Sequence, residues 1–347
     1  MKIGFLYYNF YPVVGGASVH GYHLAKELSN LGYELYKLNG EADPHTKKLE
    51  NPVTGFFWIM RNCDLIYVRM DYFINRRNLL ALFALMSKKK VIVELNSPSD
   101  ELHLFGRSKK YISRVDRLMS SVLKKAEAVI VVSTPIQAYC EKELGLSNVH
   151  VIENGGTPFE INPHKVSENL KKTISAIQNR YQKVVVWSGS SNKMQDLELL
   201  NKIANAKKED TAFILIVKDE KNDFELQAES ENLFLFKDLG RNDVEFLIES
   251  ADIGLAFYGD YTWSRWGFYN SSLKIFEYLN NGLLTITNRE GTDVQKKYPN
   301  FRFAHNIDEI LTFMSEWNGN NQKPKNIRTW QHVADQTSNI IQEVANR

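Results

Sequence analysis

Residues 184–217 read VVVWSGSSNKMQDLELLNKIANAKKEDTAFILIV, and this stretch decides the fold. A short apolar run, Val184–Trp187, passes through a Gly/Ser loop into a segment of helical periodicity, Met194–Ala206. A second apolar run follows at Ala212–Val217. Two such runs joined by a helix are typical of a βαβ unit, in which the strands lie parallel. The stretch therefore predicts a parallel sheet covered by helices.

The same alternation continues in both directions along the chain. We expect further strands at Lys2–Tyr8, Tyr33–Leu38, Leu65–Arg69, Val91–Leu95, Ala128–Val132, Val149–Ile152, Leu233–Phe236, Ile253–Ala256 and Leu284–Thr287. Further helices are expected at Ser18–Leu31, Asn75–Met86, Gln137–Leu144, Asp243–Ser250, Ser272–Asn280, Asp308–Glu316 and Trp330–Val344. This order predicts an α/β protein built from two tandem Rossmann-like domains that face each other across a cleft.

A cluster of turn-forming residues separates the two halves. Asn154-Gly155-Gly156-Thr157-Pro158 breaks both periodicities, so we expect the domain boundary there. The predicted domains are residues 1–160 and 161–326, with residues 327–347 forming a helix that packs back on the first domain. Open α/β sheets bind ligands beyond the carboxyl ends of their strands, which favours a ligand between the domains.

Composition excludes several classes of protein. Of the 347 residues, 43% are hydrophobic and 24% charged, the balance of an ordinary globular protein. A net charge of +2 argues against general nucleic-acid binding. The longest apolar run, Leu79–Met86, is far shorter than the roughly 20 residues of a spanning helix. No signal peptide is recognised, and Cys63 and Cys140 indicate neither a disulfide framework nor a zinc site, so we expect a cytoplasmic protein.

Two loops that follow strands could approach an anion. Gly15 and Gly16 precede a helix, and Gly189, Ser190 and Lys193 lie between a strand and a helix in the second half. Glycines let backbone N–H groups approach a phosphate, and a lysine adds a point charge. The alternatives are a plain strand-to-helix turn and a solvated loop lysine.

The strongest candidate is Ser271-Ser272-Leu273-Lys274-Ile275-Phe276-Glu277, followed at a distance by Gly282. Ser271 or Ser272 is expected to cap a helix whose first amides can receive a phosphate. The carboxylate of Glu277, further along, could accept hydrogen bonds from a ribose diol. The alternative is a well-capped helix with one exposed glutamate.

Taken together, these elements resemble a nucleotide-sugar glycosyltransferase of the two-domain GT-B fold, similar to glycosyltransferase family 4. The resemblance covers nearly the whole chain, and its individual motifs are degenerate. They are Gly15-Gly16, Val151-Ile152-Glu153-Asn154-Gly155, Ala251-Asp252-Ile253-Gly254-Leu255-Ala256, Lys274-Ile275-Phe276-Glu277-Tyr278-Leu279 and the helix that starts at Trp330. Tyr67-Val68-Arg69 and Glu94-Leu95-Asn96-Ser97-Pro98 are similar to segments of a bacterial subset.

The resemblance implies roles for residues on the donor side. Glu277 matches the later glutamate of the Glu-x7-Glu pair and would bind the donor ribose, whereas Tyr269 stands in place of the earlier one. Ser190 occupies the position of an arginine, so the diphosphate would depend on Lys193. The backbone amides of Ser271, Ser272 and Leu273 would also bind the diphosphate. Further candidates for this role are Lys274 and Arg265. No Asp-x-Asp motif is present, which predicts transfer from a UDP- or GDP-sugar without a metal ion.

The acceptor side is expected after the fourth strand of the first half. Glu94, Asn96, Asp100 and Glu101 are the catalytic candidates there. Asn96 falls near the place where retaining members carry a histidine. In an inverting enzyme one of the carboxylates would be the general base, with its pKa raised by burial. The resemblance favours retention and an acceptor that is a glycan or lipid-linked, in bacterial cell-surface polysaccharide or glycoconjugate synthesis.

Residues 107–125 form a basic amphipathic segment. Lys110, Arg114, Arg117, Lys124 and Lys125 fall on one helical face, and the opposite face carries Tyr111, Ile112, Val115, Leu118, Met119, Val122 and Leu123. Residues 1–165 hold 21 basic and 16 acidic residues, a net charge of +5, against −3 for residues 166–347. The helix is either a core element with a solvated basic face or a peripheral anchor to anionic lipid.

Two other functions remain open. The tyrosine at the earlier glutamate position leaves room for an inactive homologue that binds a nucleotide sugar or glycan without turnover. An NAD(P)-dependent dehydrogenase would share the tandem α/β domains, but neither half carries its G-x-G-x-x-G fingerprint. We rank glycosyl transfer first.

Overall fold

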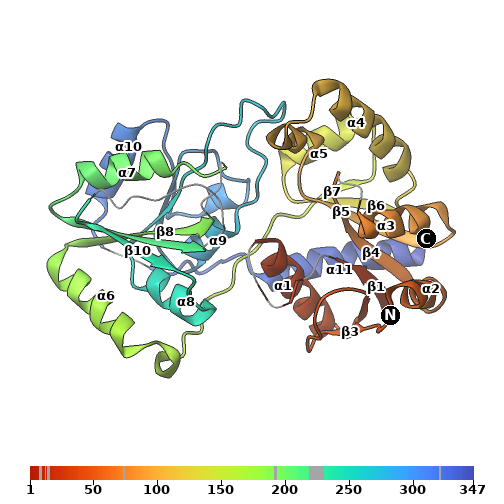
Figure 1. Cartoon of the computed structure of the whole chain (residues 1–347), viewed down its shortest axis with the longest axis horizontal. Coiled ribbons are helices and arrows are strands. Elements are labelled where there is room, and N and C mark those ends of the chain that lie inside the picture. Colours follow the sequence, from red (N-terminus) through yellow and green to blue (C-terminus); the bar gives the residue numbers. More distant parts are fainter. Residues whose placement is uncertain are drawn as a thin grey trace. The chain divides into compact units, whose positions relative to one another are not determined.

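The chain folds into two compact units. The computed structural model describes residues 1–7, 10–11, 13, 16–72, 75–190, 194–218, 230–319 and 322–347 (Figure 1). Unit 1 comprises Met1–Gly155, Tyr261–Ser271 and Thr329–Arg347, and unit 2 comprises Gly156–Asp260 and Ser272–Arg328. Each unit is an α/β layer structure around a parallel sheet, so the predicted pair of Rossmann-like domains is confirmed.

Unit 1 is built on a seven-stranded parallel sheet of order β3-β2-β1-β4-β5-β6-β7. Residue Ile3 pairs with Leu35 on one side and with Leu65 on the other, which places β1 at the point where the strand order reverses. The strands are β1 (Lys2–Leu6), β2 (Glu34–Lys37), β3 (Thr46–Lys48), β4 (Leu65–Met70), β5 (Lys90–Leu95), β6 (Ala128–Val131) and β7 (Val149–Val151).

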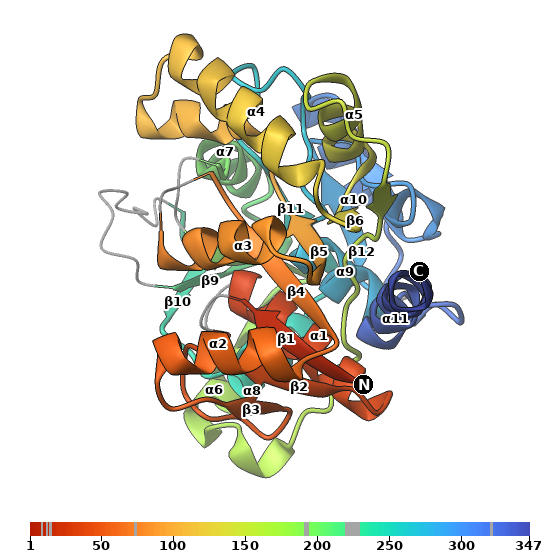
Figure 2. The ribbon, with the colours of Figure 1, turned by 90° about the vertical axis from the view of Figure 1, so that its right-hand side faces the viewer.

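Helices cover both faces of this sheet. Crossover connections between parallel strands are right-handed. From β1 to β3 the strand order runs toward one edge of the sheet, which places α1 on one face. From β3 onward the strand order runs toward the other edge, which places α2 to α5 on the opposite face. Figure 2 shows α2, α3 and α4 together on the face nearest the viewer. The helices are α1 (Gly16–Asn30), α2 (Pro52–Asn62), α3 (Arg76–Met86), the 3₁₀ turn η1 (Ser99–Phe105), α4 (Lys109–Leu123), α5 (Thr134–Lys142) and α11 (Trp330–Asn346).

The C-terminal helix α11 belongs to unit 1. Its first residue, Trp330, packs edge-on against His20 and stacks on His23, both from α1. Further along, the Ser338 hydroxyl forms a 2.7 Å hydrogen bond with Tyr33. The return of the C-terminal helix to the first domain was expected and is confirmed.

Unit 2 has a six-stranded parallel sheet of order β10-β9-β8-β11-β12-β13. Its strands are β8 (Lys183–Ser190), β9 (Thr211–Lys218), β10 (Leu233–Lys237), β11 (Ile253–Ala256), β12 (Leu284–Thr287) and β13 (Phe301–Phe303). Its helical segments are η2 (Pro163–Lys165), α6 (Glu168–Arg180), α7 (Leu197–Ala206), α8 (Arg241–Glu249), α9 (Leu273–Asn280), η3 (Gln295–Lys297) and α10 (Ile307–Glu316).

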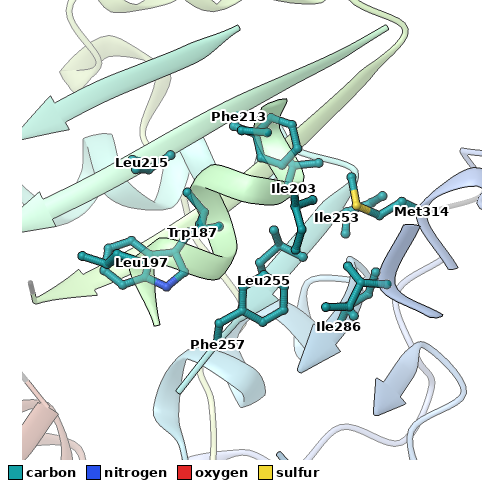
Figure 3. Packing of buried hydrophobic residues seen from close by; sticks show 14 of the residues in the cluster. Trp187, Leu197, Ile203, Phe213, Leu215, Ile253, Leu255, Phe257, Ile286 and Met314 are labelled. Carbon is teal, nitrogen blue, oxygen red and sulfur yellow. The ribbon is translucent and has the colours of Figure 1, made fainter. Parts of the chain in front are cut away.

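Strand β8 shows how this sheet is buried on both faces. Val185 and Trp187 enter a core with α7 and α10, whereas Val184 and Val186 enter the core with α6, α8 and Tyr278 of α9. Figure 3 shows the first core, with Trp187 lying beside Leu197. Burial on both faces explains why the strand is a continuous apolar run in the sequence.

The unit boundary falls at the predicted Gly/Pro cluster. A Cβ on Gly155 would lie 2.6 Å from the Thr329 carbonyl oxygen, and one on Gly156 would lie 2.9 Å from backbone atoms of Phe276. Glycine is therefore needed at both positions for close backbone packing. Every expected strand is present, and β3 and β13 are additional. Within the described ranges, no helix combines the length and the apolar character that crossing a bilayer requires.

One segment differs from the expected domain division. Residues 261–271 join β11 to α9 of unit 2, yet they pack with unit 1. We call this segment the strap. Its place in unit 1 follows from contacts with residues far away in sequence, which are described below.

Candidate functional site

A lysine lies beside the carboxyl end of β8 in unit 2. Lys274, in the first turn of α9, donates a 2.8 Å hydrogen bond from Nζ to Oε1 of Gln195. The same ammonium group lies 4.4 Å from the centroid of the Trp187 ring, within range of a cation–π interaction. A Cβ on Gly189 would come within 2.8 Å of Nζ, so the absence of a side chain at Gly189 makes room for the ammonium.

The charge of Lys274 is not neutralised within the described part of the chain. None of the described carboxylates forms a salt bridge with it, and its contacts are an amide oxygen and aromatic rings. Burial lowers the pKa of Lys274 to about 7, which the more distant charge of Glu277 only partly offsets. The residue still keeps part of its surface exposed. An anion reaching it would restore the protonated form.

The start of α9 differs in detail from the expectation. Ser272 occupies the N-cap position with extended backbone, but its side chain makes no capping hydrogen bond. Its hydroxyl instead accepts a hydrogen bond from the Tyr258 hydroxyl. Ser271 lies in unit 1, where its hydroxyl accepts a 2.9 Å hydrogen bond from the Asn154 backbone N–H. The first amides of α9, beginning at Leu273, therefore lack a side-chain cap.

Glu277 lies one turn beyond Lys274. Its Oε1 accepts a 2.7 Å hydrogen bond from Nη2 of Arg241, whose Nε donates to Glu245 at the same distance. The Glu277 side chain is 13% exposed, whereas the alternative interpretation expected an exposed glutamate. Tyr278, the next residue, ties α9 to β8, because its hydroxyl accepts the Ser188 backbone N–H at 2.8 Å.

The strap carries three predicted site residues of the second half, namely Arg265, Tyr269 and Ser271. Tyr269 is 1% exposed, and within the described residues its hydroxyl has no hydrogen-bond partner. Burial raises the pKa of Tyr269. The Ser133 hydroxyl donates to the Tyr269 carbonyl oxygen at 2.6 Å. Tyr269 therefore belongs to unit 1, near Asp100 and Glu101, which are predicted for the acceptor side.

Arg265 anchors the strap through carboxylates. Its backbone N–H and Nε donate to Asp100 at 2.7 and 2.9 Å, Nη2 lies 3.1 Å from Asp116, and Nη1 lies 3.0 Å from Glu143. Burial by itself lowers the pKa of Arg265, but hydrogen bonding to Asp100 and Asp116 raises it above the usual value. These contacts already engage two predicted site residues. Arg265 is a candidate for binding the diphosphate, and Asp100 is a candidate general base.

Glu94 is the centre of a buried polar network at the end of β5. It accepts hydrogen bonds from Tyr67 at 2.6 Å, Asn96 at 2.7 Å and Tyr7 at 2.8 Å. Two further side chains are close as well, with Nε2 of His20 at 3.4 Å and the guanidinium Nη1 of Arg69 at 3.7 Å. Burial alone would raise the pKa of Glu94, but these donors and charges outweigh it and hold the pKa well below its ordinary value. Glu94 is thus held as an ionised carboxylate whose oxygens already accept hydrogen bonds from several side chains.

Glu101 has a different environment from Glu94. It lies in η1 with part of its surface exposed, and burial raises its pKa although Ser97 and Arg69 act in the opposite direction. Asn96 is partly exposed too, and its Oδ1 has no hydrogen-bond partner among the described residues. Glu101 therefore has the raised pKa that a general base requires.

Several predicted positions lie outside the described residues. Gly15 and Lys193 are among them, as is the side chain of Ser190, whereas Gly16 is the first residue of α1. Four residues that surround Lys274 and Glu277 were not predicted, namely Trp187, Gln195, Arg241 and Tyr258. They come from separate elements and belong to no motif, so the sequence carries no sign that they lie close together.

Comparison with known proteins gives structural relatives only. No family model and no curated protein matches the sequence. A glycosyltransferase structure from Rickettsia africae aligns with 99% of this chain and 97% of its own, at 15% identity and a TM-score of 0.63. Anabaena HepE in complex with UDP and glucose aligns with 99% and 100%, at 14% identity and a TM-score of 0.66.

A third solved structure extends the comparison. The lipopolysaccharide outer core galactosyltransferase WaaB aligns over 99% of both chains, at 12% identity and a TM-score of 0.57. Identities this low show the fold and leave the chemistry open. All three alignments run over nearly the full length, so they include both units of the chain. The chain therefore has the two-domain GT-B fold of these glycosyltransferases.

Proposed function

We propose that this chain is a glycosyltransferase that moves a sugar from a nucleotide-sugar donor to a glycan or a lipid-linked acceptor. Within the GT-B fold, the motifs quoted above favour glycosyltransferase family 4. The observation that carries the proposal is the partly exposed, unneutralised ammonium of Lys274 beside the uncapped start of α9. One solved relative, HepE, binds ligands of the expected class in two structures, UDP-glucose in one and UDP with glucose in the other.

The donor diphosphate would be held by the amides at Ser272, Leu273 and Lys274 together with the Lys274 ammonium. Helix N-termini favour anions, and a cation with no carboxylate partner adds to the attraction. Charge builds up on the diphosphate as the sugar leaves, so these donors would stabilise the transition state more than the ground state. Gly189 would keep the space beside the ammonium open, and Lys193 stays a predicted contact.

Glu277 would accept hydrogen bonds from the donor ribose through the carboxylate oxygen that Arg241 does not engage. Arg241 fixes the position of the carboxylate through a 2.7 Å hydrogen bond. An ionised acceptor of this kind forms stronger hydrogen bonds than a neutral one.

On the acceptor side, the surroundings of the predicted residues separate those that could act on the acceptor from those that position others. Glu101 suits a general base if transfer inverts the anomeric carbon. Asn96 stays a predicted acceptor contact, although its Oδ1 is buried in the ligand-free structure. Glu94 and Asp100 would act as positioning residues, since each is already hydrogen-bonded by several groups. Retention, which the resemblance favours, would leave Glu101 to orient the acceptor instead.

We further propose that transfer is metal-independent and serves bacterial cell-surface polysaccharide or glycoconjugate synthesis on the cytoplasmic side. The donor would be a UDP- or GDP-sugar. The basic segment 107–125 would bring the enzyme to an anionic membrane where lipid-linked acceptors reside.

The substitution Glu277→Ala tests the donor site. UDP-glucose affinity, measured by calorimetric titration, should fall by about 1.5–3 kcal/mol, or roughly 10- to 150-fold, because a charge-assisted hydrogen bond is lost. Glu245→Ala is the matched control, since it also removes a 2.7 Å acceptor from Arg241 but has no assigned ligand contact. Equal affinity losses in the two variants would show that Glu277 acts only through Arg241.

The inactive-homologue alternative has its own outcome. Its motivation is Tyr269, which stands where family members carry a glutamate and lies with unit 1. A chain that binds UDP-sugars in the titration, but neither hydrolyses them nor glycosylates any acceptor tested, would be a binding protein. Release of UDP together with sugar transfer would establish the enzyme.

A further inference from the structure

The strap, residues 261–271, contains neither a helix nor a strand, although it belongs to unit 1. It is held to the rest of that unit by side chains. The Ser133 hydroxyl donates to the Tyr269 carbonyl oxygen at 2.6 Å, and the Ser271 hydroxyl accepts the Asn154 backbone N–H at 2.9 Å. Because no helix or sheet ladder has to break, such a segment can open locally while the rest of its unit stays folded.

One side chain, Arg265, joins the strap to three segments of unit 1. Its guanidinium lies 2.8 Å from Asp100 in η1, 3.1 Å from Asp116 in α4 and 3.0 Å from Glu143 at the end of α5. The Arg265 side chain is nevertheless 45% exposed. Ion pairs that water reaches are weaker than enclosed ones and are screened by salt. The anchor of the strap can therefore be released.

Asp100 depends on the strap for its partners. Within the described part of the chain, every hydrogen bond to its carboxylate comes from Arg265, through the backbone N–H at 2.7 Å and Nε at 2.9 Å. Asp100 is 1% exposed. A carboxylate that stayed buried after losing these donors would be strongly disfavoured. When the strap leaves, Asp100 must therefore meet water.

Asp116 differs from Asp100, because it has partners outside the strap. It accepts hydrogen bonds from the Tyr139 hydroxyl at 2.8 Å and from the Ser99 hydroxyl. The sequence predicted Leu118 for the core face of the same helix, and this is wrong, since Leu118 is 57% exposed. The buried stripe of α4 consists of Ile112, Asp116, Met119 and Leu123. Asp116 thus stays enclosed by its own helix packing, whereas Asp100 is covered by the strap.

The docked strap also encloses two polar groups that have no hydrogen-bond partner among the described residues, the Tyr269 hydroxyl and Nε1 of Trp266. Tyr269 is 1% exposed, and the Trp266 ring packs edge-on against Tyr139 with ring centroids 5.8 Å apart. Water would pair both groups once the strap is released, so their burial opposes docking. Docking is therefore a balance between the ion contacts of Arg265 and the cost of these unpaired groups.

We propose that the strap is a latch over the acceptor side of unit 1, which opens when Arg265 leaves its carboxylates. In the docked state it buries Asp100 and Tyr269, and in the released state both are exposed to an incoming acceptor. The latch gives Arg265 an anchoring role in place of the diphosphate contact that the resemblance implied. Assigning the uncovered surface to an acceptor rests on the proposed function, whereas the opening itself does not.

Carboxylate footprinting of the full chain measures the opening. A water-soluble carbodiimide with glycine ethyl ester labels carboxylates that reach solvent, and peptide mass spectrometry gives the rate at each site. Arg265→Met should raise the labelling rate of Asp100 at least about tenfold, because charge-assisted hydrogen bonds are lost. Glu94, also 1% exposed, is bound by side chains outside the strap and should keep its wild-type rate. The ratio of variant to wild type at each site cancels differences in intrinsic reactivity.

Two further variants sharpen this test. Arg117→Met is the matched control, since it removes an exposed arginine of α4 that donates to the Ser113 carbonyl oxygen, and it should leave the Asp100 rate unchanged. Arg265→Lys keeps the charge without the guanidinium fork and should give an intermediate rate. In the wild-type chain, raising salt from about 0.15 M to about 1 M should also accelerate labelling of Asp100 relative to Glu94, because exposed ion pairs are screened.

Three outcomes would overturn the latch. The first is an Asp100 rate that neither Arg265→Met nor salt changes. The second is equal acceleration at Asp100 and Glu94, which would mean that unit 1 opens as a whole. The third is a loss of UDP-glucose affinity in Arg265→Met without faster labelling of Asp100, which would return Arg265 to the diphosphate. Labelling needs neither donor nor turnover, so its result is independent of the experiments that test the proposed function.

Discussion

Glu94 in unit 1 and Lys274 in unit 2 are charges enclosed near the carboxyl ends of parallel strands, but their surroundings are opposite. Glu94 is 1% exposed and accepts hydrogen bonds from Tyr7, Tyr67 and Asn96, with His20 and Arg69 close by. Lys274 has one amide oxygen and two aromatic rings around it. Burial disfavours the charged form of both groups. At Glu94 the surrounding partners outweigh burial and lower the pKa, whereas at Lys274 burial prevails and the pKa stays below its usual value.

The difference separates a structural charge from a charge suited to a ligand. A buried ion that is fully paired within its own domain stabilises that domain and has little left to offer a substrate. A buried ion without a counter-ion destabilises the empty protein and gains most from an anion. Changing each residue should therefore affect different quantities, and the predictions below are ordered by expected size.

The largest effect is expected for Glu94→Leu. Removing the carboxylate leaves Arg69, His20 and the tyrosine hydroxyls without their common acceptor, which should reduce the stability of unit 1 by about 3–5 kcal/mol. Hydrogen exchange of the β4 and β5 amides, read as the free energy of opening, measures this locally in a chain of two units. Glu94→Gln keeps an acceptor and should lose less. Unchanged exchange in Glu94→Leu would show that the network contributes nothing to stability.

Lys274→Met should affect ligand affinity and leave stability nearly unchanged, the opposite of Glu94→Leu. Stability of unit 2 should be unchanged or slightly higher, because a desolvated cation is replaced by an apolar side chain. UDP-glucose affinity should fall by about 1.5–3 kcal/mol with the loss of a charged donor to the diphosphate.

Lys183→Met is the matched control for this substitution. Lys183 donates to the Met314 and Ser315 carbonyl oxygens at the other end of β8, so the same charge is lost away from the proposed donor contacts. Comparable affinity in the Lys274→Met variant and the wild type, measured by titration, would remove Lys274 from the donor site.

Most of the fold was predictable from local patterns. The strands of both sheets are apolar runs, since parallel strands covered on both faces must be apolar throughout. β3 was missed because its residues, Thr46, Lys47 and Lys48, form a short polar edge strand paired only with β2. α2 was also missed, although Asn51 caps it and Pro52 occupies its first turn, which are recognisable start signals.

The arrangement of the sites was much less predictable. Glu277 and Lys274 were found because they lie in one continuous motif. The environment that lowers the pKa of Lys274 depends on Trp187 and Tyr258 from other elements, and the network of Glu94 draws on residues as distant as Tyr7. The strap illustrates the limit most clearly. Arg265 meets Asp100, Asp116 and Glu143 only in the folded chain, so a division by sequence order could not assign the strap to unit 1.

A pH titration should show a smaller and more specific difference. The pKa of Lys274 is about 7 in the folded, ligand-free chain and about 10.4 when unfolded, so between these values the unfolded chain binds more protons. Stability of unit 2 should therefore rise with pH in this window. UDP-glucose affinity should fall over the same window by up to about 1.4 kcal/mol per pH unit, because the ligand needs the protonated amine.

The sugar diphosphate is the suitable ligand for this titration, because it lacks the terminal phosphate proton that titrates near pH 6. Lys274→Met should remove the pH dependence of binding. A slope that persists in the variant would point to another titrating group.

The smallest effect is expected for Gly189→Ala. The new Cβ would lie 2.8 Å from Nζ of Lys274 and 3.3 Å from the Trp187 ring, so the ammonium must shift by a few tenths of an ångström. The end of a lysine side chain moves easily, and we expect UDP-glucose affinity to fall by less than about 1 kcal/mol with little change in stability. In the Lys274→Met background the same substitution should cost nothing further, since the two sites act through one contact. Additive losses in the double variant would show that Gly189 contacts the ligand by itself.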